Sequence, residues 1–432
     1  MYKRMSDSAV TRLLFDAVQR DDIVEAESIV SEMTDMHQKA FALATCITQD
    51  NLDILKAFMR RGCDPLLKYR GISALARCVQ RDQHEVLQTL VEGYLPLSQH
   101  QPDSRLLYRV KRALDEALFE AASFCSVRCI EYLLDAGANC NSYSYHDDEF
   151  LSWCPPIIAA CYAPICKRAS HQSVNQTVRT LVKYGCDINK ENHMNDTALY
   201  WACGAGIVDV VRLLVRNGAD VNHGNSVGKT PLMILGELSN NSNDLENFLS
   251  AAKILVHYGA DLNQADTSGW TGLHFAVHHS FLALVRLLLQ SGASTKTSGM
   301  DRSKMTMLIS CLSLAIQLQK ADIVRLLLEW NADPNHPVEE LGLHNIYENL
   351  DVAVMLYNVG AKGIGNMIRD DMVQSLCASA KSNMKYIRQL EHPQPLLLLC
   401  KVRIRRCLRD PFMHNVVTLP LPSTLIEYVS SV

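Results

Sequence analysis

The chain has 432 residues, of which 48% are apolar and 20% charged, and a formal net charge of −4. This composition excludes a largely disordered chain, and the small negative charge gives no reason to expect nucleic acid as a partner. No apolar run reaches the roughly 18–20 residues that a membrane-spanning helix needs, so we also expect no membrane partner.

The first 37 residues contain an imperfect copy of a pattern that recurs along the chain. A full copy has large aliphatic residues, two polar residues, a glycine, a small residue and then Asp or Asn, as in LVRNGADVN and LVHYGADLN. Because the first copy lacks the glycine, residues 1–37 predict an N-terminal capping repeat. We expect each later anchor to take the left-handed conformation that ends a helix. These anchors, within residues 38–361, are Gly62, Gly93, Gly137, Gly185, Gly218, Gly259, Gly292, Asn331 and Gly360.

A second phrase precedes the first and reads TALYWA, TPLMIL, TGLHFA and, more loosely, SCLSLA. Its opening hydroxyl residue can cap a helix, its leucine is expected to face the core, and its alanine lets neighbouring helices approach. The capping residues are Thr197, Thr230, Thr271 and Ser310, the leucines Leu199, Leu232, Leu273 and Leu312, and the alanines Ala202, Ala276 and Ala315.

Together the two phrases resemble the ankyrin repeat. The resemblance implies an all-α fold, an ankyrin-repeat solenoid of about ten helix–turn–helix units, each with a turn or hairpin, over residues 38–361. Polar stretches within this array predict loop insertions at residues 94–112, 142–154, 163–175 and 239–247. After the array, residues 362–391 predict one or two amphipathic helices that close it.

Residues 392–432 form a separate module, marked by prolines and by five Lys or Arg against two Asp or Glu. Leu396, Cys400 and Ile404 are four residues apart, so they line one face of a helix that starts after Pro395. An LPLP sequence follows. The order and spacing of the two motifs resemble a SOCS box. The resemblance implies elongin C binding by Pro395, Leu396, Leu397, Cys400, Ile404 and Leu408, and cullin binding by Val416, Leu419, Pro420, Leu421 and Pro422.

The combination of repeats and box resembles the ankyrin repeat and SOCS box family. It implies a non-catalytic subunit of an E3 ubiquitin ligase, whose partners are elongin B/C, a cullin with its RING subunit, and an unknown protein substrate. The LPLP form favours cullin-5 over cullin-2. The alternatives are an ankyrin scaffold outside any ligase and an enzyme that uses the array as a support. The basic run 401–409 could also be a nuclear signal or an RNA-binding patch, but its interleaved aliphatic residues favour a solvated helix face.

Other candidate sites are weaker. His274 and His278 are one helical turn apart and could bind a metal, but His274 belongs to the repeat phrase and no third ligand is evident. No local sequence favours a Cys–His nucleophile, so we expect no catalytic residue, metal or cofactor. MYKRMSDSAV lacks the apolar core of a secretory signal. The fifteen cysteines are therefore expected to be free thiols in a reducing compartment, the cytoplasm or, second, the nucleus.

The ankyrin resemblance also implies a substrate surface. It places the turn before each first helix, and the end of that helix, on the concave face. The corresponding positions are His193, Met194 and Asp196 in one repeat, Ser226, Val227 and Lys229 in the next, and Thr267, Ser268, Trp270, His278 and His279 in the third. We expect Trp270 to face solvent as a binding anchor, the alternative being a purely packing role, and Trp201 to lie in the core. His278 and His279 would add hydrogen-bond donors and a pH response.

Overall fold

The computed structural model describes residues 7–33, 35–93, 104–144, 153–238, 245–300 and 308–334, and four single residues between 352 and 359. The chain divides into two compact units. The first comprises Met1–Pro231 and Asp244–Ala260, and the second comprises Leu232–Asn243 and Asp261–Val432. Within the described ranges, no helix is both long enough and apolar enough to cross a membrane.

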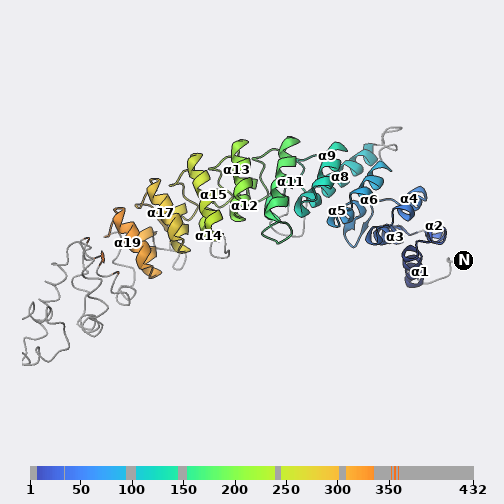
Figure 1. The fold of residues 1–432 in the computed structure, drawn as a ribbon, viewed down its shortest axis with the longest axis horizontal. Coiled ribbons are helices and arrows are strands. Elements are labelled where there is room, and N and C mark those ends of the chain that lie inside the picture. The colour runs from blue at the N-terminus through green and yellow to red at the C-terminus, as the bar shows by residue number, and fades with distance from the viewer. Residues whose placement is uncertain are drawn as a thin grey trace, which may run out of the picture. The chain divides into compact units, whose positions relative to one another are not determined.

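The first unit is a row of antiparallel helix pairs, which follow one another in chain order in Figure 1. Each pair shares an apolar interface, as expected for repeats that cannot bury their apolar faces alone. Its helices are α1 (Asp7–Gln19), α2 (Ile23–Glu32), α3 (Met36–Gln49), α4 (Leu52–Arg60), α5 (Ala74–Gln80), α6 (His84–Glu92), α8 (Ser104–Phe124), α9 (Val127–Asp135), α10 (Pro156–Tyr162), α11 (His171–Lys183), α12 (Ala198–Gly204), α13 (Val208–Arg216) and α15 (Leu245–His257). A short hairpin of β1 (Lys68–Tyr69) and β2 (Ile72–Ser73) precedes α5.

The second unit continues the same pattern. Its helices are α14 (Pro231–Leu238), which begins at the last residue of the preceding segment, α16 (Gly272–His278), α17 (Leu282–Gln290), α18 (Cys311–Gln317) and α19 (Ala321–Glu329). An antiparallel hairpin of β3 (Ser298–Met300) and β4 (Leu308–Ser310) leads into α18, with Gly299 opposite Ile309. The predicted all-α class is therefore confirmed, with small hairpins in the turns between helix pairs.

The glycine anchors act as predicted in all but one of the described cases. Six of them have φ between 76° and 96°, and Asn331 has φ 57°. Gly93 was expected to share this conformation, and that expectation is wrong. Its φ is −64° and its N–H donates to the Thr89 carbonyl, so the backbone stays helical there. Gly360 lies outside the described residues.

The capping prediction is confirmed at Thr197 and Ser310, and the packing prediction is confirmed at the phrase leucines and alanines. The cap at Thr230 stays a prediction. Thr197 Oγ1 accepts from the Tyr200 N–H at 3.3 Å, and Ser310 Oγ accepts from the Ser313 N–H at 3.2 Å. At Thr271 the N–H donates to His274 Nδ1 at 3.2 Å, so the histidine of the phrase helps to cap its own helix. The four phrase leucines and the three alanines are all buried.

An asparagine four residues after the glycine anchor links successive repeats. Asn189 Oδ1 accepts from the Asp220 N–H at 2.9 Å, and its Nδ2 donates to the Gly218 carbonyl at 3.0 Å. In the second unit, Asn263 Oδ1 accepts from the Ser294 N–H at 2.8 Å. These bonds satisfy turn backbone groups that the helices leave unpaired, which explains the asparagine at this position.

One predicted insertion is helical in its second half. Residues 94–112 were expected to form a loop, but α8 begins at Ser104, so the expectation is wrong for residues 104–112. Val110, Ala113 and Ala117 are buried at helical spacing, which extends the apolar stripe of α8 toward its start. α8 is therefore 21 residues long, whereas α5 and α10 have seven residues each. The insertion at 163–175 likewise ends early, because α11 begins at His171 after the capping residue Ser170.

Candidate protein-binding surface

The turns before α12 and α14 are built on two asparagines. Asn192 Oδ1 accepts from the N–H groups of Met194 and Asp196, both at 2.9 Å. Asn225 repeats the arrangement, because its Oδ1 accepts from the Val227 N–H at 3.1 Å and from the Lys229 N–H at 2.9 Å. The two turns are joined directly, because the Ser226 N–H donates to the Met194 carbonyl at 2.9 Å.

This arrangement exposes some of the predicted contact residues and buries one. His193, Ser226 and Val227 are exposed, whereas Met194 and Lys229 are half-buried. Asp196 was expected on the contact surface, and that expectation is wrong, since its exposed fraction is 2%. Its carboxylate accepts from Asn225 Nδ2 at 2.9 Å and from Asn192 Nδ2 at 3.2 Å. Burial raises the pKa of Asp196, although these hydrogen bonds act in the opposite direction. Asp196 therefore holds the two turns together from inside.

In the second unit, Asp266 takes the place of the turn asparagine. Its Oδ1 accepts from the Ser268 N–H at 2.9 Å and from the Trp270 N–H at 2.8 Å. The next hairpin is attached to this turn, because the Met300 N–H donates to the Ser268 carbonyl at 2.7 Å. Thr267 is exposed and Ser268 is half-buried.

The prediction that Trp270 faces solvent is wrong. Its exposed fraction is 1%, and its Nε1–H donates to the Met300 carbonyl at 2.7 Å. Its ring lies edge-on to Phe275 at 5.3 Å. A Cβ on Gly299 would lie 2.4 Å from Trp270 Cδ1, so strand β3 rests directly on the indole. The following repeat thus covers a side chain that its own repeat leaves open.

The predictions for Trp201 and for the His278–His279 pair can also be compared with the structure. Trp201 is buried, as predicted, with its ring edge-on to Tyr162 at 4.8 Å. His278 is exposed, and His279 is half-buried, 4.8 Å away between ring centroids. Whether His278 and His279 contact a substrate stays a prediction.

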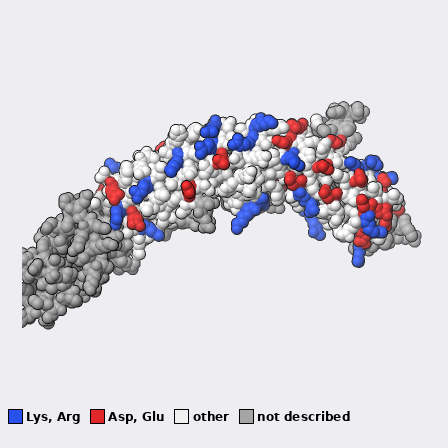
Figure 2. Space-filling view, in the orientation of Figure 1, with Lys and Arg blue, Asp and Glu red and all other residues white. Residues whose placement is uncertain are grey.

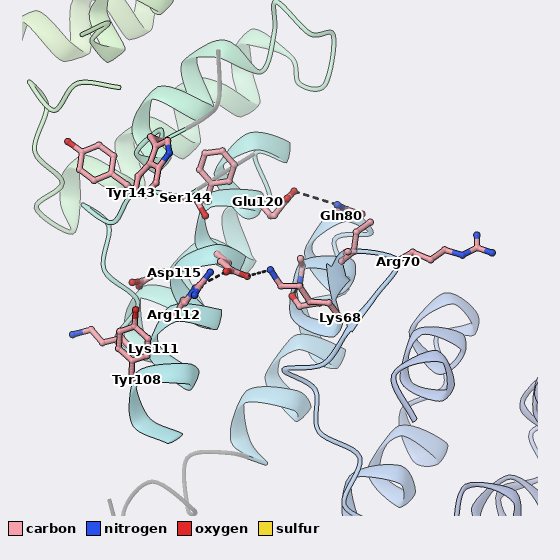
Figure 3. Close-up of a pocket in the computed structure, with 17 residues that line it drawn as sticks. Lys68, Arg70, Gln80, Tyr108, Lys111, Arg112, Asp115, Glu120, Tyr143 and Ser144 are labelled. Atoms are coloured by element: carbon pink, nitrogen blue, oxygen red, sulfur yellow. Dashed lines mark hydrogen bonds and ion pairs between the residues drawn. The ribbon is translucent and has the colours of Figure 1, made fainter. Parts of the chain in front are cut away.

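A cleft that the sequence did not predict lies in the first unit. It has a volume of about 1130 Å³ and is bounded by the β1–β2 hairpin with α5, by α8, and by the turn around Ser144. Figure 3 shows Tyr108, Lys111, Arg112 and Asp115 along α8, with Lys68 on the hairpin. Three lining aromatic residues are exposed: Tyr108 (68%), Tyr143 (47%) and Trp153 (59%). The start of α8 was predicted as a loop, so its contribution to a cleft was not predicted.

The charges in and around the cleft are mixed. Glu116 forms ion pairs with Lys68 at 3.0 Å and with Arg112 at 3.2 Å. Asp115 Oδ1 accepts from the Asn139 N–H at 2.7 Å, and burial raises the pKa of this carboxyl group. In Figure 2, acidic and basic side chains are interspersed over the N-terminal helices of the first unit. Both signs of charge therefore line the cleft and its surroundings.

Buried thiols and the buried His274 are held neutral. Burial raises the pKa of Cys63 and of Cys125 to about 11 and lowers the pKa of His274 to about 4. The thiols of Cys161 and Cys203 are fully buried and their pKa values are raised further. Neutral buried thiols are poor nucleophiles. Across the described ranges, no three His, Cys, Asp or Glu side chains are grouped as a metal site.

The predicted elongin-binding and cullin-binding residues, between Pro395 and Pro422, lie outside the described residues, as do the predicted closing helices of 362–391. The boundaries predicted for the four regions of the chain stay predictions.

Comparison with known families identifies both kinds of module. A family model of ankyrin repeats in three copies matches residues 165–243 and 241–337, and a model of the SOCS box matches residues 392–430. The predicted ankyrin repeats and SOCS box are therefore confirmed, while the number of repeats stays a prediction. Modules of these two kinds are typically non-catalytic adaptors, and together they support a cullin–RING substrate adaptor in general terms.

Individual relatives share only short segments with the chain. An "Ankyrin repeat, SAM and basic leucine zipper domain-containing protein 1" from Carollia perspicillata is 37% identical over 94 residues, which are 22% of this chain and 19% of that protein. The mouse protein of the same name is 38% identical over 88 residues, 20% of this chain and 18% of its own length. Human "Protein phosphatase 1 regulatory subunit 27" is 39% identical over 57 residues, 13% of this chain and 37% of the relative. The chain thus covers well under half of these relatives.

Proposed function

Because the chain combines ankyrin repeats with a SOCS box that follows them, we propose that it is the substrate receptor of a cullin-5–elongin B/C–RING ubiquitin ligase. SOCS boxes generally bind elongin B/C and a cullin. The match at residues 392–430 is the observation that carries the proposal, and the LPLP sequence within it supports cullin-5. The residues proposed to bind elongin C are Pro395, Leu396, Leu397, Cys400, Ile404 and Leu408, and those proposed to bind the cullin are Val416, Leu419, Pro420, Leu421 and Pro422.

The proposed mechanism is proximity. The repeats hold a target protein while the box holds the ligase machinery, so a lysine of the target meets the ubiquitin thioester at a raised effective concentration. The chain needs no reactive group of its own for this role. Ubiquitination of the target, and its degradation by the proteasome, would follow.

On the substrate side, we propose that the exposed turns contact the target. The exposure of His193, Ser226 and Val227 in the first unit supports this role. The other proposed contacts are Met194, Lys229, Thr267, Ser268, His278 and His279, all of which are exposed or half-buried. Asp196 and Trp270 support these turns from within and are no longer proposed as contacts.

The proposal is tested by replacing Leu396 with Pro and Cys400 with Phe in one variant. We expect loss of elongin C in a pull-down, because both residues lie on the proposed apolar face, and an unchanged melting curve of the repeats. Arg405→Ala and Arg406→Ala, away from that face, are the matched control and should keep elongin C. Full capture by the double variant would contradict the assignment.

The cullin motif is tested separately by changing Leu419, Pro420, Leu421 and Pro422 to Ala. This variant should lose cullin-5 while keeping elongin B/C. Capture of cullin-2 by the unaltered chain would contradict the choice of cullin. Capture of neither elongin B/C nor a cullin would favour the alternative of a scaffold outside any ligase.

A further inference from the structure

The cleft beside α8 is a built feature of the first unit rather than a gap between loops. Arg109, in the first turns of α8, pairs with Asp64 at 2.9 Å on the side of the hairpin. Glu116 pairs with Lys68 on the hairpin itself at 3.0 Å. On the other side of α8, Asp115 accepts from the Asn139 N–H. The extra turns of one helix therefore fix the two neighbouring turns at a set separation.

The cleft presents aromatic side chains that stay largely exposed. Tyr108, Tyr143 and Trp153 are each about half exposed or more, although exposed aromatic rings carry a hydrophobic cost. Trp153 is also held at φ 48°, an uncommon conformation for a residue with a large side chain. The backbone beside it is pinned, since the Cys154 N–H donates to the Ser144 carbonyl at 3.2 Å. Exposed Tyr and Trp in a fixed position are typical of protein-binding anchors.

Acceptors and donors in the cleft differ in their engagement. The three carboxylates are all engaged: Glu116 by two cations, Asp115 by a backbone N–H, and Glu120 by Gln80 Nε2 at 3.5 Å. Lys68 and Arg112 are engaged by Glu116, whereas no hydrogen bond or ion pair joins Lys111 Nζ or the hydroxyl groups of Tyr108 and Tyr143 to the described residues. Lys190 adds a further cation, 4.5 Å above the Tyr143 ring. A partner that supplies acceptors and negative charge therefore complements the cleft.

The charged lining of the cleft favours a polypeptide over a small molecule. Small-molecule sites enclose about 300–1,000 Å³ and are mostly apolar. This cleft has about 1130 Å³, and seven of its seventeen lining residues are charged. In Figure 3 it runs along the helix from Tyr108 to Glu120, between the hairpin and the turn that carries Tyr143 and Ser144.

We propose that this cleft binds an acidic segment of a protein partner, with an aromatic or large aliphatic side chain of that segment seated against Tyr108, Tyr143 and Trp153. The partner's carboxylates face Lys111 and Lys190. This inference rests on the proposed function in one respect, which is that the segment would belong to the protein that the ligase modifies. It adds a docking site distinct from the exposed turns at residues 193–229.

The test uses the full chain together with elongin B/C and a display library of random dodecapeptides. We expect the enriched peptides to carry several Asp or Glu and at least one large apolar residue. Binding of synthetic copies of these peptides is then measured by fluorescence polarisation. Affinity should fall as salt is raised, because the attraction is partly electrostatic at an exposed site.

Variants locate the binding in the cleft. Tyr108→Ser with Trp153→Ser should weaken the enriched peptides at least about tenfold, and Lys111→Glu about fivefold, in line with loss of hot-spot and charge contacts. Tyr258→Ser with Trp330→Ser, and Lys56→Glu, replace exposed residues of the same types elsewhere and should leave affinity within about twofold. Melting curves verify that every variant is folded.

The outcomes separate this inference from the proposed function. No enrichment, enrichment of basic peptides, or equal binding by the cleft variants would overturn the cleft proposal. If elongin B/C still copurifies in those cases, the proposed ligase role is untouched. If acidic peptides bind in the cleft but elongin B/C does not copurify with the chain, the cleft stands and the ligase role falls.

Discussion

Aromatic residues in the two units differ in their exposure to solvent. Trp270 in the second unit is covered by strand β3, and its indole N–H donates to the Met300 carbonyl. Tyr108, Tyr143 and Trp153 in the first unit stay exposed around a cleft. In the second unit the next hairpin packs onto the preceding turn. In the first unit, the additional turns of α8 stand between two turns and leave the rings open.

The difference shows that an unusual aromatic residue near a repeat turn is not by itself a binding anchor. What decides is whether the following repeat supplies a backbone that covers the ring. Trp270 has such a cover, and its replacement is expected to destabilise the fold. The cleft residues have none, and their replacement is expected to affect binding alone.

The largest expected effect comes from Trp270→Ala. Removing a fully buried tryptophan should lower the free energy of unfolding by about 3–5 kcal/mol. Urea denaturation followed by circular dichroism measures this change, and the transition need not be two-state in a repeat protein. Trp330→Ala, at an exposed position, is the matched control and should change stability by no more than about 0.5 kcal/mol. Unchanged stability of Trp270→Ala would contradict the structural role of Trp270 and favour a role in binding.

A pH effect should accompany the burial of His274, which lies beside Trp270. Burial lowers its pKa from the ordinary 6.5 to about 4, opposed in part by the charge of Asp266. The unfolded chain therefore takes up the proton first as the pH falls. The contribution of the neutral His274 to the free energy of unfolding is fully present above pH 6.5. It should be lost progressively down to pH 4, by up to about 3 kcal/mol. Denaturation at several pH values measures it.

The matched control for this pH effect is the exposed His278. His278→Gln should leave the pH dependence between 6.5 and 4 as it is, whereas His274→Gln should flatten it. Equal slopes for the unaltered protein and for His274→Gln would show that other groups carry the acid sensitivity.

A smaller loss is expected for Gly299→Ala. The added methyl group would meet Trp270 Cδ1 at 2.4 Å and the Gly269 backbone at 3.0 Å, so the hairpin must shift. Overpacking of this kind costs about 1–3 kcal/mol. Gly272→Ala is the control, because its new methyl group would meet only the Leu232 side chain, at 3.3 Å. Chemical denaturation should rank Gly299→Ala as the more destabilising change, and the reverse ranking would contradict the tight cover over Trp270.

The smallest effect on stability is expected at the cleft. Tyr108→Ala and Trp153→Ala should each change the free energy of unfolding by no more than about 0.5 kcal/mol, because both side chains are exposed. Thermal melts of the single variants measure this. A loss above 1–2 kcal/mol, the range of a buried contact, would show that these rings support the fold and would narrow the contrast with Trp270.

Much of the repeat architecture could be predicted from the sequence because its signals are local. A hydroxyl residue that caps a helix and a glycine that ends one act within a few residues of themselves, as at Thr197 and Gly218. The SOCS box was recognisable for the same reason, since Leu396, Cys400 and Ile404 recur at intervals of four residues. The prediction for Gly93 was wrong because a glycine does not by itself force the backbone into the left-handed conformation.

The candidate surface depended on contacts that no local signal contains. Asp196 is buried because Asn225, in the next repeat, reaches its carboxylate. Trp270 is buried because Gly299 and Met300, one repeat further along, lie over it. The cleft exists because α8 starts early enough to hold turns on both of its sides.

The sequence by itself thus determined the repeat frame, the helix ends and the presence of the box, all of which follow from residue types at short spacing. Only the tertiary structure decided which polar and aromatic side chains face solvent. The physical reason is that exposure in a stack of repeats is set by the neighbouring repeat. A tryptophan and an aspartate that look available within their own repeat become core when the next one packs against them.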